Sequence, residues 1–147
     1  MLRPSRRLIA TLEAVLDIAS NEAGRPVQSK DIMRRQSIPE RYLEPVMQRL
    51  VHAGVLAGVR GPRGGYRLAR ERRRIKLAEI VRLVEAMDRE NADELSALGE
   101  RVIRPLLEEL GKELDAKLET ITLEDLCRRA EASGIESEAR TRLDFSI

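Results

Sequence analysis

The 147-residue sequence contains one cysteine, one histidine and very few aromatic side chains. Because Cys127 has no partner cysteine, an intrachain disulfide cannot form, which fits a reducing compartment. A single histidine and a single cysteine cannot build a multi-cysteine zinc site. The aromatic content of 2% provides too few stacking platforms for a typical single-stranded RNA-binding surface.

Long apolar runs and catalytic constellations are also missing. No stretch approaches the roughly 18 apolar residues of a membrane span. Glu13 and Asp17 interrupt the apolar segment after the basic N-terminus, which argues against an export signal. Nothing pairs Cys127 with His52, and no acid–base pair is recognisable. We therefore predict a cytoplasmic protein that does not contact a membrane, is not an enzyme and holds no metal or cofactor.

The charges are distributed unevenly along the chain. Residues 1–76 carry 17 Lys and Arg against 7 Asp and Glu, a net charge of +10, whereas residues 77–147 carry 10 against 18, a net charge of −8. This asymmetry predicts a polyanion-binding module joined to a segment that does not touch the polyanion. Chance clustering of charge on solvated surfaces is the alternative.

Hydrophobic periodicity predicts a mainly helical fold. Pro45 lies beyond the first turn of one expected helix, so we expect an irregular first turn or a bend there. Thr122 begins a last short helix that contains Cys127. The other expected helices cover residues 5–21, 29–36, 40–53 and 77–86.

The segment 58–68 predicts a β-hairpin. Val59 and Tyr66 are strand-prone, the residues between them include glycines and a proline, and no carboxylate in the segment neutralises its arginines. A cationic hairpin after two helices joined by a tight turn is the geometry of a winged helix-turn-helix, whose second helix lies in the major groove. A nucleotide-binding loop is disfavoured because the Gly-Lys-Ser/Thr ending is absent.

The residues expected to contact DNA lie on the third helix and in the hairpin. Arginine can bond guanine, glutamine adenine, and glutamate the amino group of cytosine. Glycines permit close approach of the hairpin, and its arginines suit a narrow minor groove. For each residue alone, an ordinary solvated surface is the alternative. The predicted set is Arg41, Tyr42, Glu44, Gln48, Arg49, Arg60, Gly61, Pro62, Arg63, Gly64, Gly65, Tyr66 and Arg67.

Leucines recur at helical spacing between residues 93 and 118, where Pro105 should kink or restart the helix. A continuous helix of about 26 residues would span roughly 39 Å, too long for a small domain to cover alone. We expect a second copy of the chain to cover it, and packing on the chain's own core is the alternative. The predicted dimerisation seam is Leu95, Leu98, Leu106, Leu110, Leu114 and Leu118.

These patterns divide the chain into three parts. Residues 1–86 are expected to form the DNA-binding domain, 87–132 the dimerisation and C-terminal helices, and 133–147 a flexible polar tail. Cys127 can be either a redox switch or a packing residue.

Three segments carry a resemblance to a known family: Tyr42-Leu43-Glu44, Ala53-Gly54-Val55-Leu56, and Val59 to Leu68. With further matches over 75–80 and, more weakly, over 120–123, the chain resembles the IscR/NsrR/CymR-type family of bacterial winged helix-turn-helix transcriptional regulators. The resemblance implies a homodimer that binds a palindromic DNA operator. It also places Arg41, Glu44 and Arg60 at DNA-contacting positions.

The segment 86–99 departs from the cluster-binding members of that family. Those members hold an iron–sulfur cluster with three cysteines in this segment, whereas this segment has none. We therefore expect a repressor without a cluster. Resemblance to cluster-free relatives suggests a regulatory protein partner, such as cysteine synthase, that binds the carboxylate of Ile147. A winged-helix module that binds a protein instead of DNA is the alternative function.

Overall fold

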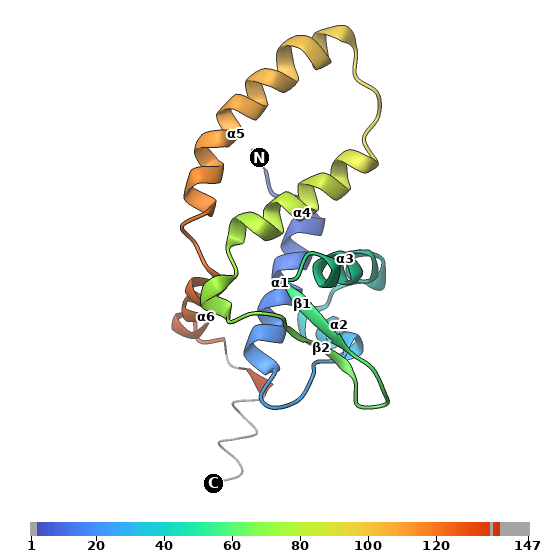
Figure 1. The fold of residues 1–147 in the computed structure, drawn as a ribbon, viewed down its shortest axis with the longest axis vertical. Coiled ribbons are helices and arrows are strands. Elements are labelled where there is room, and N and C mark those ends of the chain that lie inside the picture. Colours follow the sequence, from blue (N-terminus) through green and yellow to red (C-terminus); the bar gives the residue numbers. More distant parts are fainter. Residues whose placement is uncertain (1–2, 136, 139–147) are drawn as a thin grey trace.

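The computed structural model describes residues 3–135 and 137–138 (Figure 1). Within them the architecture is mainly helical, as predicted, with one two-stranded antiparallel sheet. None of the described helices has the length and apolarity needed to cross a bilayer. The elements in chain order are α1 (Arg6–Asn21), α2 (Ser29–Gln36), α3 (Glu40–His52), β1 (Leu56–Val59), β2 (Gly65–Leu68), the 3-10 helix η1 (Arg72–Arg74), α4 (Leu77–Glu90), the π-helical turn η2 (Gly99–Ile103), α5 (Arg104–Leu118) and α6 (Leu123–Ala132).

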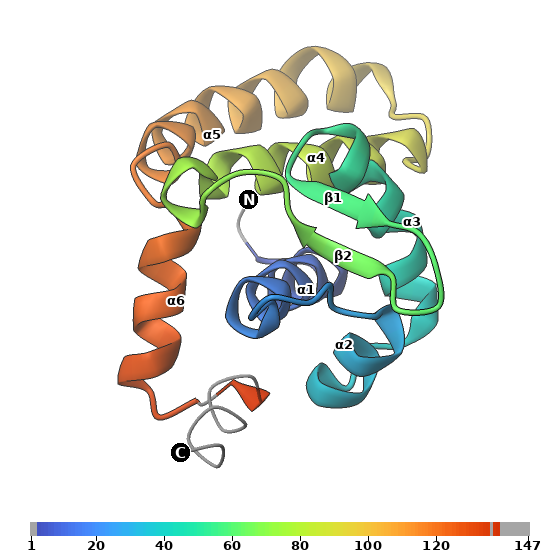
Figure 2. The same cartoon turned by 60° about the horizontal axis from the view of Figure 1, so that its bottom comes forward.

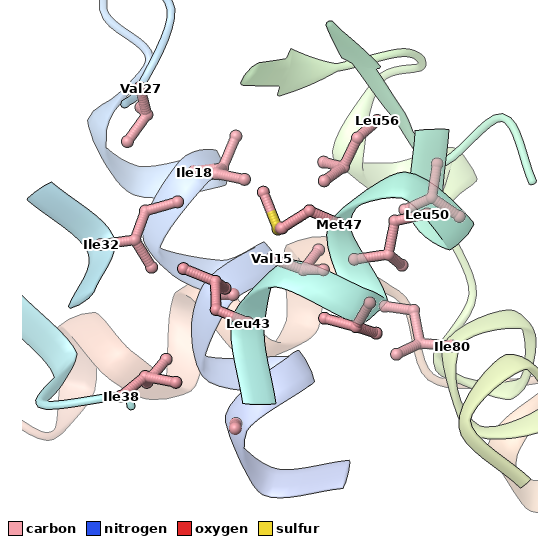
Figure 3. Packing of buried hydrophobic residues seen from close by; sticks show 14 of the residues in the cluster. Val15, Ile18, Val27, Ile32, Ile38, Leu43, Met47, Leu50, Leu56 and Ile80 are labelled. Atoms are coloured by element: carbon pink, nitrogen blue, oxygen red, sulfur yellow. The ribbon is translucent and has the colours of Figure 1, made fainter. Parts of the chain in front are cut away.

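Helix α1 lies at the centre of the molecule and contacts α2, α3, α4, α6 and β2 (Figure 2). Ser5 caps it, because its hydroxyl accepts a hydrogen bond from the Leu8 amide at 3.1 Å. Val15 and Ile18 on its apolar face are fully buried, and Figure 3 shows them beside Met47 of α3. Each such side chain stabilises the fold by roughly 1.5–3 kcal/mol through burial.

Helices α2 and α3 are joined by a tight turn. Ser37 ends α2 in the left-handed conformation, with φ of 52°, and the buried Ile38 ties the turn to the core. Helix α3 then runs through Pro45 without interruption. The irregularity expected for this helix is limited to its first turn, where the Pro39 carbonyl accepts hydrogen bonds from two successive amides, at 3.0 and 3.4 Å.

Strands β1 and β2 form the predicted hairpin, in which Leu56 pairs with Leu68 and Val59 pairs with Gly65. A third segment joins this sheet through a single β-bridge. Val27, in the loop between α1 and α2, exchanges two 2.8 Å backbone hydrogen bonds with Tyr66. The hairpin is therefore fixed directly to the segment that leads into the helix-turn-helix.

Helix α4 extends to Glu90, beyond the expected end at residue 86. The extension places Met87 against the core, where it is buried. At the other end of the helix, the Glu79 carboxylate accepts a 2.9 Å hydrogen bond from the Lys76 amide and so satisfies a donor at the helix start. The added turn is thus stabilised by burial that the sequence pattern alone did not reveal.

The helix expected to begin at residue 93 begins instead at Ala97. In the π-helical turn η2, the Arg104 amide donates to the Gly99 carbonyl, five residues earlier. Pro105 follows immediately and has no amide to donate. The wider turn lets the helix reach the proline without a conventional bond at that point, so Pro105 reshapes the start of α5.

Helix α5 arches away from α4 and returns to the body of the molecule at its C-terminal end (Figure 1). Leu118 packs there in a small apolar cluster that includes Leu8 and Val81. Two 2.8 Å backbone hydrogen bonds fix the return, one from the Leu77 amide to the Ile121 carbonyl and one from the Leu123 amide to the Ile75 carbonyl. The start of α4 and the end of α5 are therefore joined.

Replacing Leu50 with Ala should lower the free energy of unfolding by about 2–5 kcal/mol, because it empties a fully buried site between α3 and the rest of the core. The measurement is urea denaturation followed by far-UV circular dichroism. Val51 is the matched control, since it follows Leu50 on the same helix but is 36% exposed, and its change to Ala should cost less than about 1 kcal/mol. Equal losses in the two variants would contradict this core.

Candidate nucleic-acid interface

Helix α3 presents one face to the core and the opposite face to solvent. Leu43, Met47 and Leu50 are buried, as the periodicity predicts. Arg41, Glu44 and Gln48 project from the exposed face. The outer surface of the second helix of the helix-turn-helix is therefore free to enter a groove and carries groups that can recognise base edges.

Tyr42 is half-buried and lies between two cations. The Arg41 guanidinium carbon is 4.9 Å from the ring centroid, and that of Arg6 is 5.7 Å from it. These cation–π contacts place Arg6, from the first turn of α1, beside the start of α3. Arg6 therefore lies beside the predicted phosphate contact of Tyr42, and the sequence analysis did not include this arginine in the interface.

Arg49, by contrast, is bound by the chain itself. Its guanidinium donates two hydrogen bonds to the Glu90 carboxylate, at 2.9 and 2.6 Å. The hydrogen bond from Arg49 holds the pKa of Glu90 below its usual range, so the pair is ionised at neutral pH. Arg49 can reach DNA only after it leaves Glu90, which distinguishes it from the other predicted contacts on α3.

The hairpin carries its arginines at exposed positions. Arg60, Arg63 and Arg67 are exposed, and none makes an ion pair within the described part of the chain. Gly61 and Pro62 form the exposed tip between the strands. The tip is therefore a cationic surface with nothing of its own to neutralise it, as a DNA-binding wing requires.

Two glycines of the hairpin are required by close contacts. A Cβ on Gly64 would overlap the Val59 carbonyl oxygen across the turn. A Cβ on Gly65 would overlap the Val27 carbonyl, and φ at this residue is +151°. The role of these glycines is thus to close the turn and to let the hairpin pack against the α1–α2 loop.

The base of the hairpin is braced along β2 and just after it. Tyr66 is half-buried against the core, and the Leu68 amide donates a 2.8 Å hydrogen bond to the Glu22 carboxylate. Arg70 donates to the Gly54 carbonyl at 3.1 Å and to Glu79 at 2.7 Å, which ties the end of β2 to the turn after α3 and to α4. These contacts fix the orientation of the hairpin relative to α3.

A basic hollow that the sequence did not reveal lies beside the wing. It has a volume of about 580 Å³ and lies among the α1–α2 loop, α2 and the wing tip. The sequence shows only that basic residues are frequent in and around α2, and it does not indicate that they gather at one site. Its cations are Arg25, Lys30, Arg34, Arg35 and Arg63.

The predicted dimerisation residues divide into two groups. Leu114 and Leu118 pack toward the chain's own core. Four others, Leu95, Leu98, Leu106 and Leu110, are between 45% and 64% exposed.

Cys127 is buried in α6 next to Arg72. Burial raises the pKa of its thiol, and the nearby Arg72 opposes that rise only in part. A protonated, buried thiol reacts slowly, which favours packing among the two roles considered for it.

Two helices joined by a tight turn, followed by a braced hairpin with free arginines, define a DNA-binding protein of the winged helix-turn-helix class. The family model Rrf2, described as an iron-dependent transcriptional regulator, matches residues 5–129. The chain therefore belongs to the Rrf2 family, which contains the regulators it was predicted to resemble. Members of this family are transcriptional regulators, so the chain is a regulator and not an enzyme.

Individual relatives agree with this assignment. The chain is 37% identical over 122 residues to the HTH-type transcriptional regulator IscR of Xenorhabdus nematophila, covering 80% of this chain and 74% of the relative. It is 36% identical over 121 residues to Protein rrf2 of Nitratidesulfovibrio vulgaris, covering 79% and 81%.

Solved structures share the fold. IscR of T. potens superposes with a TM-score of 0.70 at 34% identity, covering 89% of this chain and 90% of that one. CymR, the global cysteine regulator of B. subtilis, superposes with a TM-score of 0.65 at 27% identity, covering 88% and 98%. These similarities confirm the predicted fold class.

Replacing Gly64 with Ala should weaken duplex DNA binding by about tenfold or more, because backbone strain of about 1–3 kcal/mol reshapes the wing tip. Fluorescence anisotropy with a labelled duplex measures the affinity, and circular dichroism checks that the helices persist. Gly58 in β1 is the matched control, since an added Cβ meets nothing within 4 Å there. Similar affinities for the two alanine variants would show that wing shape does not matter.

Proposed function

We propose that the protein is a dimeric, sequence-specific DNA-binding regulator that represses transcription without an iron–sulfur cluster. The observation that carries this proposal is the pairing of an exposed polar face on α3 with a braced, cationic wing beside it (Figure 1). Such a pairing suits a major groove and the minor groove next to it. Binding to chromosomal DNA is consistent with the cytoplasmic location that the sequence predicts.

Each element has a separate part in recognition. Arg41, Glu44 and Gln48 would read base edges, because their side chains project from α3 without a charged partner of their own among the described residues. Arg60 and Arg63 would supply charge to the minor groove and the adjacent phosphates. Sequence preference therefore depends mainly on α3, and affinity depends heavily on the wing.

The exposed face of α5 supports a homodimer. A single chain in water rarely presents such a continuous apolar strip, which a second copy would bury. Leu98 is 64% exposed and Leu110 is 57% exposed. Two joined copies would present two recognition helices, which matches a palindromic operator. The apolar side chains of this strip are Leu95, Leu98, Val102, Ile103, Leu106, Leu107 and Leu110.

The residues of this chain do not fit an iron–sulfur cluster of the type inferred for its relatives. The segment 86–99 contains no thiol, and Cys127 lies on α6, buried against Arg72. The described residues include no group of three or more His, Cys, Asp or Glu side chains that could hold a metal ion. A cluster needs thiolate ligands as a rule, so the signal that controls this protein must be of another kind.

A regulatory protein partner is the second hypothesis. Ile147, whose carboxylate such a partner would bind, lies outside the described residues. The hypothesis therefore stays a prediction from the family resemblance.

Replacing Arg60 with Ala should weaken binding to the duplex upstream of the protein's own gene by about tenfold. The plot of log affinity against log salt concentration should lose about one unit of slope, because one phosphate contact is lost. Anisotropy titrations at several salt concentrations give both quantities. Arg73, exposed on η1 and paired with Glu71, is the control whose change to Ala should alter neither. An unchanged slope for Arg60→Ala would remove the wing from the interface.

Replacing Leu106 with Glu should raise the dimer dissociation constant by about a hundredfold or more, because an unpaired charge would be buried between the α5 helices. Sedimentation equilibrium measures the constant. Ala116→Glu is the control, since it adds the same charge at an exposed position of α5 away from the apolar strip. Wild-type dimerisation in the Leu106→Glu variant would contradict this interface.

A further inference from the structure

The basic hollow beside the wing holds a carboxylate that comes from the far end of the chain. Its wall carries Arg34 and Arg35 of α2, and Glu138 lies against both of them. The following steps rest on the proposed DNA-binding function. They concern a surface on α2 that shares only Arg63 with the proposed α3 and wing contacts.

Three hydrogen bonds hold the Glu138 carboxylate. Arg34 donates two of them, at 3.0 and 3.1 Å, in a bidentate arrangement, and Arg35 donates the third at 2.9 Å. These bonds hold the pKa of Glu138 near about 2, so the carboxylate stays charged at neutral pH. Two arginines that grip a carboxylate in this way provide the same donors that a phosphate group accepts.

Arg35 is fixed in place before any anion arrives. Its Nε and Nη2 atoms each donate a 2.8 Å hydrogen bond to Asp17, whose side chain is fully buried in α1. Gln36 donates a further 2.8 Å bond to the same carboxylate. Because Asp17 already neutralises one face of the guanidinium, Nη1 is left to face the hollow and bind Glu138.

The hollow adjoins the wing tip. Arg63 of the wing tip lines it, and the Gln28 side chain at the start of α2 donates a 3.5 Å hydrogen bond to the Pro62 carbonyl. Its five cations face only Asp31 and Glu138 among its acidic lining residues. With Glu138 removed, the surplus of positive charge would attract a phosphate.

We propose that this hollow is a backbone-phosphate site for duplex DNA and that Glu138 occupies it in the free protein. The tail then competes with DNA for Arg34 and Arg35, so only the fraction of molecules whose tail is released binds with full affinity. The contact is independent of sequence, because phosphates carry no base information. It adds α2 to the interface formed by α3 and the wing.

Anisotropy titrations of the full-length protein with a mixed-sequence duplex test the proposal. Glu138→Gln should raise affinity by about three- to tenfold. Arg34→Gln should lower it by a similar factor and reduce the salt slope by about one. In the Arg34→Gln background, Glu138→Gln should raise affinity by a smaller factor than in the wild type, because only the bond to Arg35 remains for the tail to release. Glu131→Gln, which removes an exposed charge from α6, is the control for a general charge effect.

The outcomes separate this inference from the proposed function. A wild-type protein that binds no duplex would overturn both. Binding that depends on Arg60 but is the same for wild type and Glu138→Gln would overturn the phosphate site alone. Thermal melting tests whether the Glu138 contacts only stabilise the fold. A Glu138→Gln variant that melts at a lower temperature and binds DNA no better would overturn the phosphate site. Glu138→Ala repeats the comparison with a second side chain.

Discussion

The burial of one face of α1 supports every other part of this protein. Val15 and Ile18 fill the space between α2, α3 and the sheet, and Leu8 extends the same face to α4 and the end of α5. The recognition helix, the wing and the long arm of α4 and α5 therefore share a single apolar support. A close-packed protein interior has low compressibility. The elements that pack on α1 therefore keep fixed positions relative to one another.

The arginines fall into two groups with different uses. One group is engaged by the chain's own carboxylates, as Arg35 is by Asp17, Arg49 by Glu90 and Arg70 by Glu79. The other group, which includes Arg41, Arg60 and Arg63, makes no ion pair with a carboxylate in the part of the chain that the structure describes. The net charge of +10 on residues 1–76 therefore overstates the charge that is available to a ligand.

Local signals explain why much of the fold and of the interface could be predicted from sequence. Leu43, Met47 and Leu50 repeat at helical spacing, and Gly64 and Gly65 mark a turn that no larger residue could form. Contacts between distant residues were invisible for the opposite reason. Arg34 and Glu138 are 104 positions apart, and no periodicity links them.

The C-terminal half shows the same limit in another form. The last four leucines of the seam are each four residues apart, yet Leu118 is buried on the chain's own core while Leu110 is 57% exposed. Spacing specifies a face of a helix but not what covers it, because the path of the chain decides that. The π-helical turn before Pro105 sets this path, and its geometry depends on a bond to Gly99 that propensity does not describe.

Two backbone hydrogen bonds join residues 75–77 to residues 121–123. The segment between them therefore leaves the body of the molecule and returns to it at the same place. Its far bend, over 91–98, is exposed. Insertions and deletions at such a bend leave the anchored ends undisturbed, because few buried groups there resist change. The bend can therefore change during evolution to respond to a different signal, while the surface formed by α3 and the wing keeps its shape.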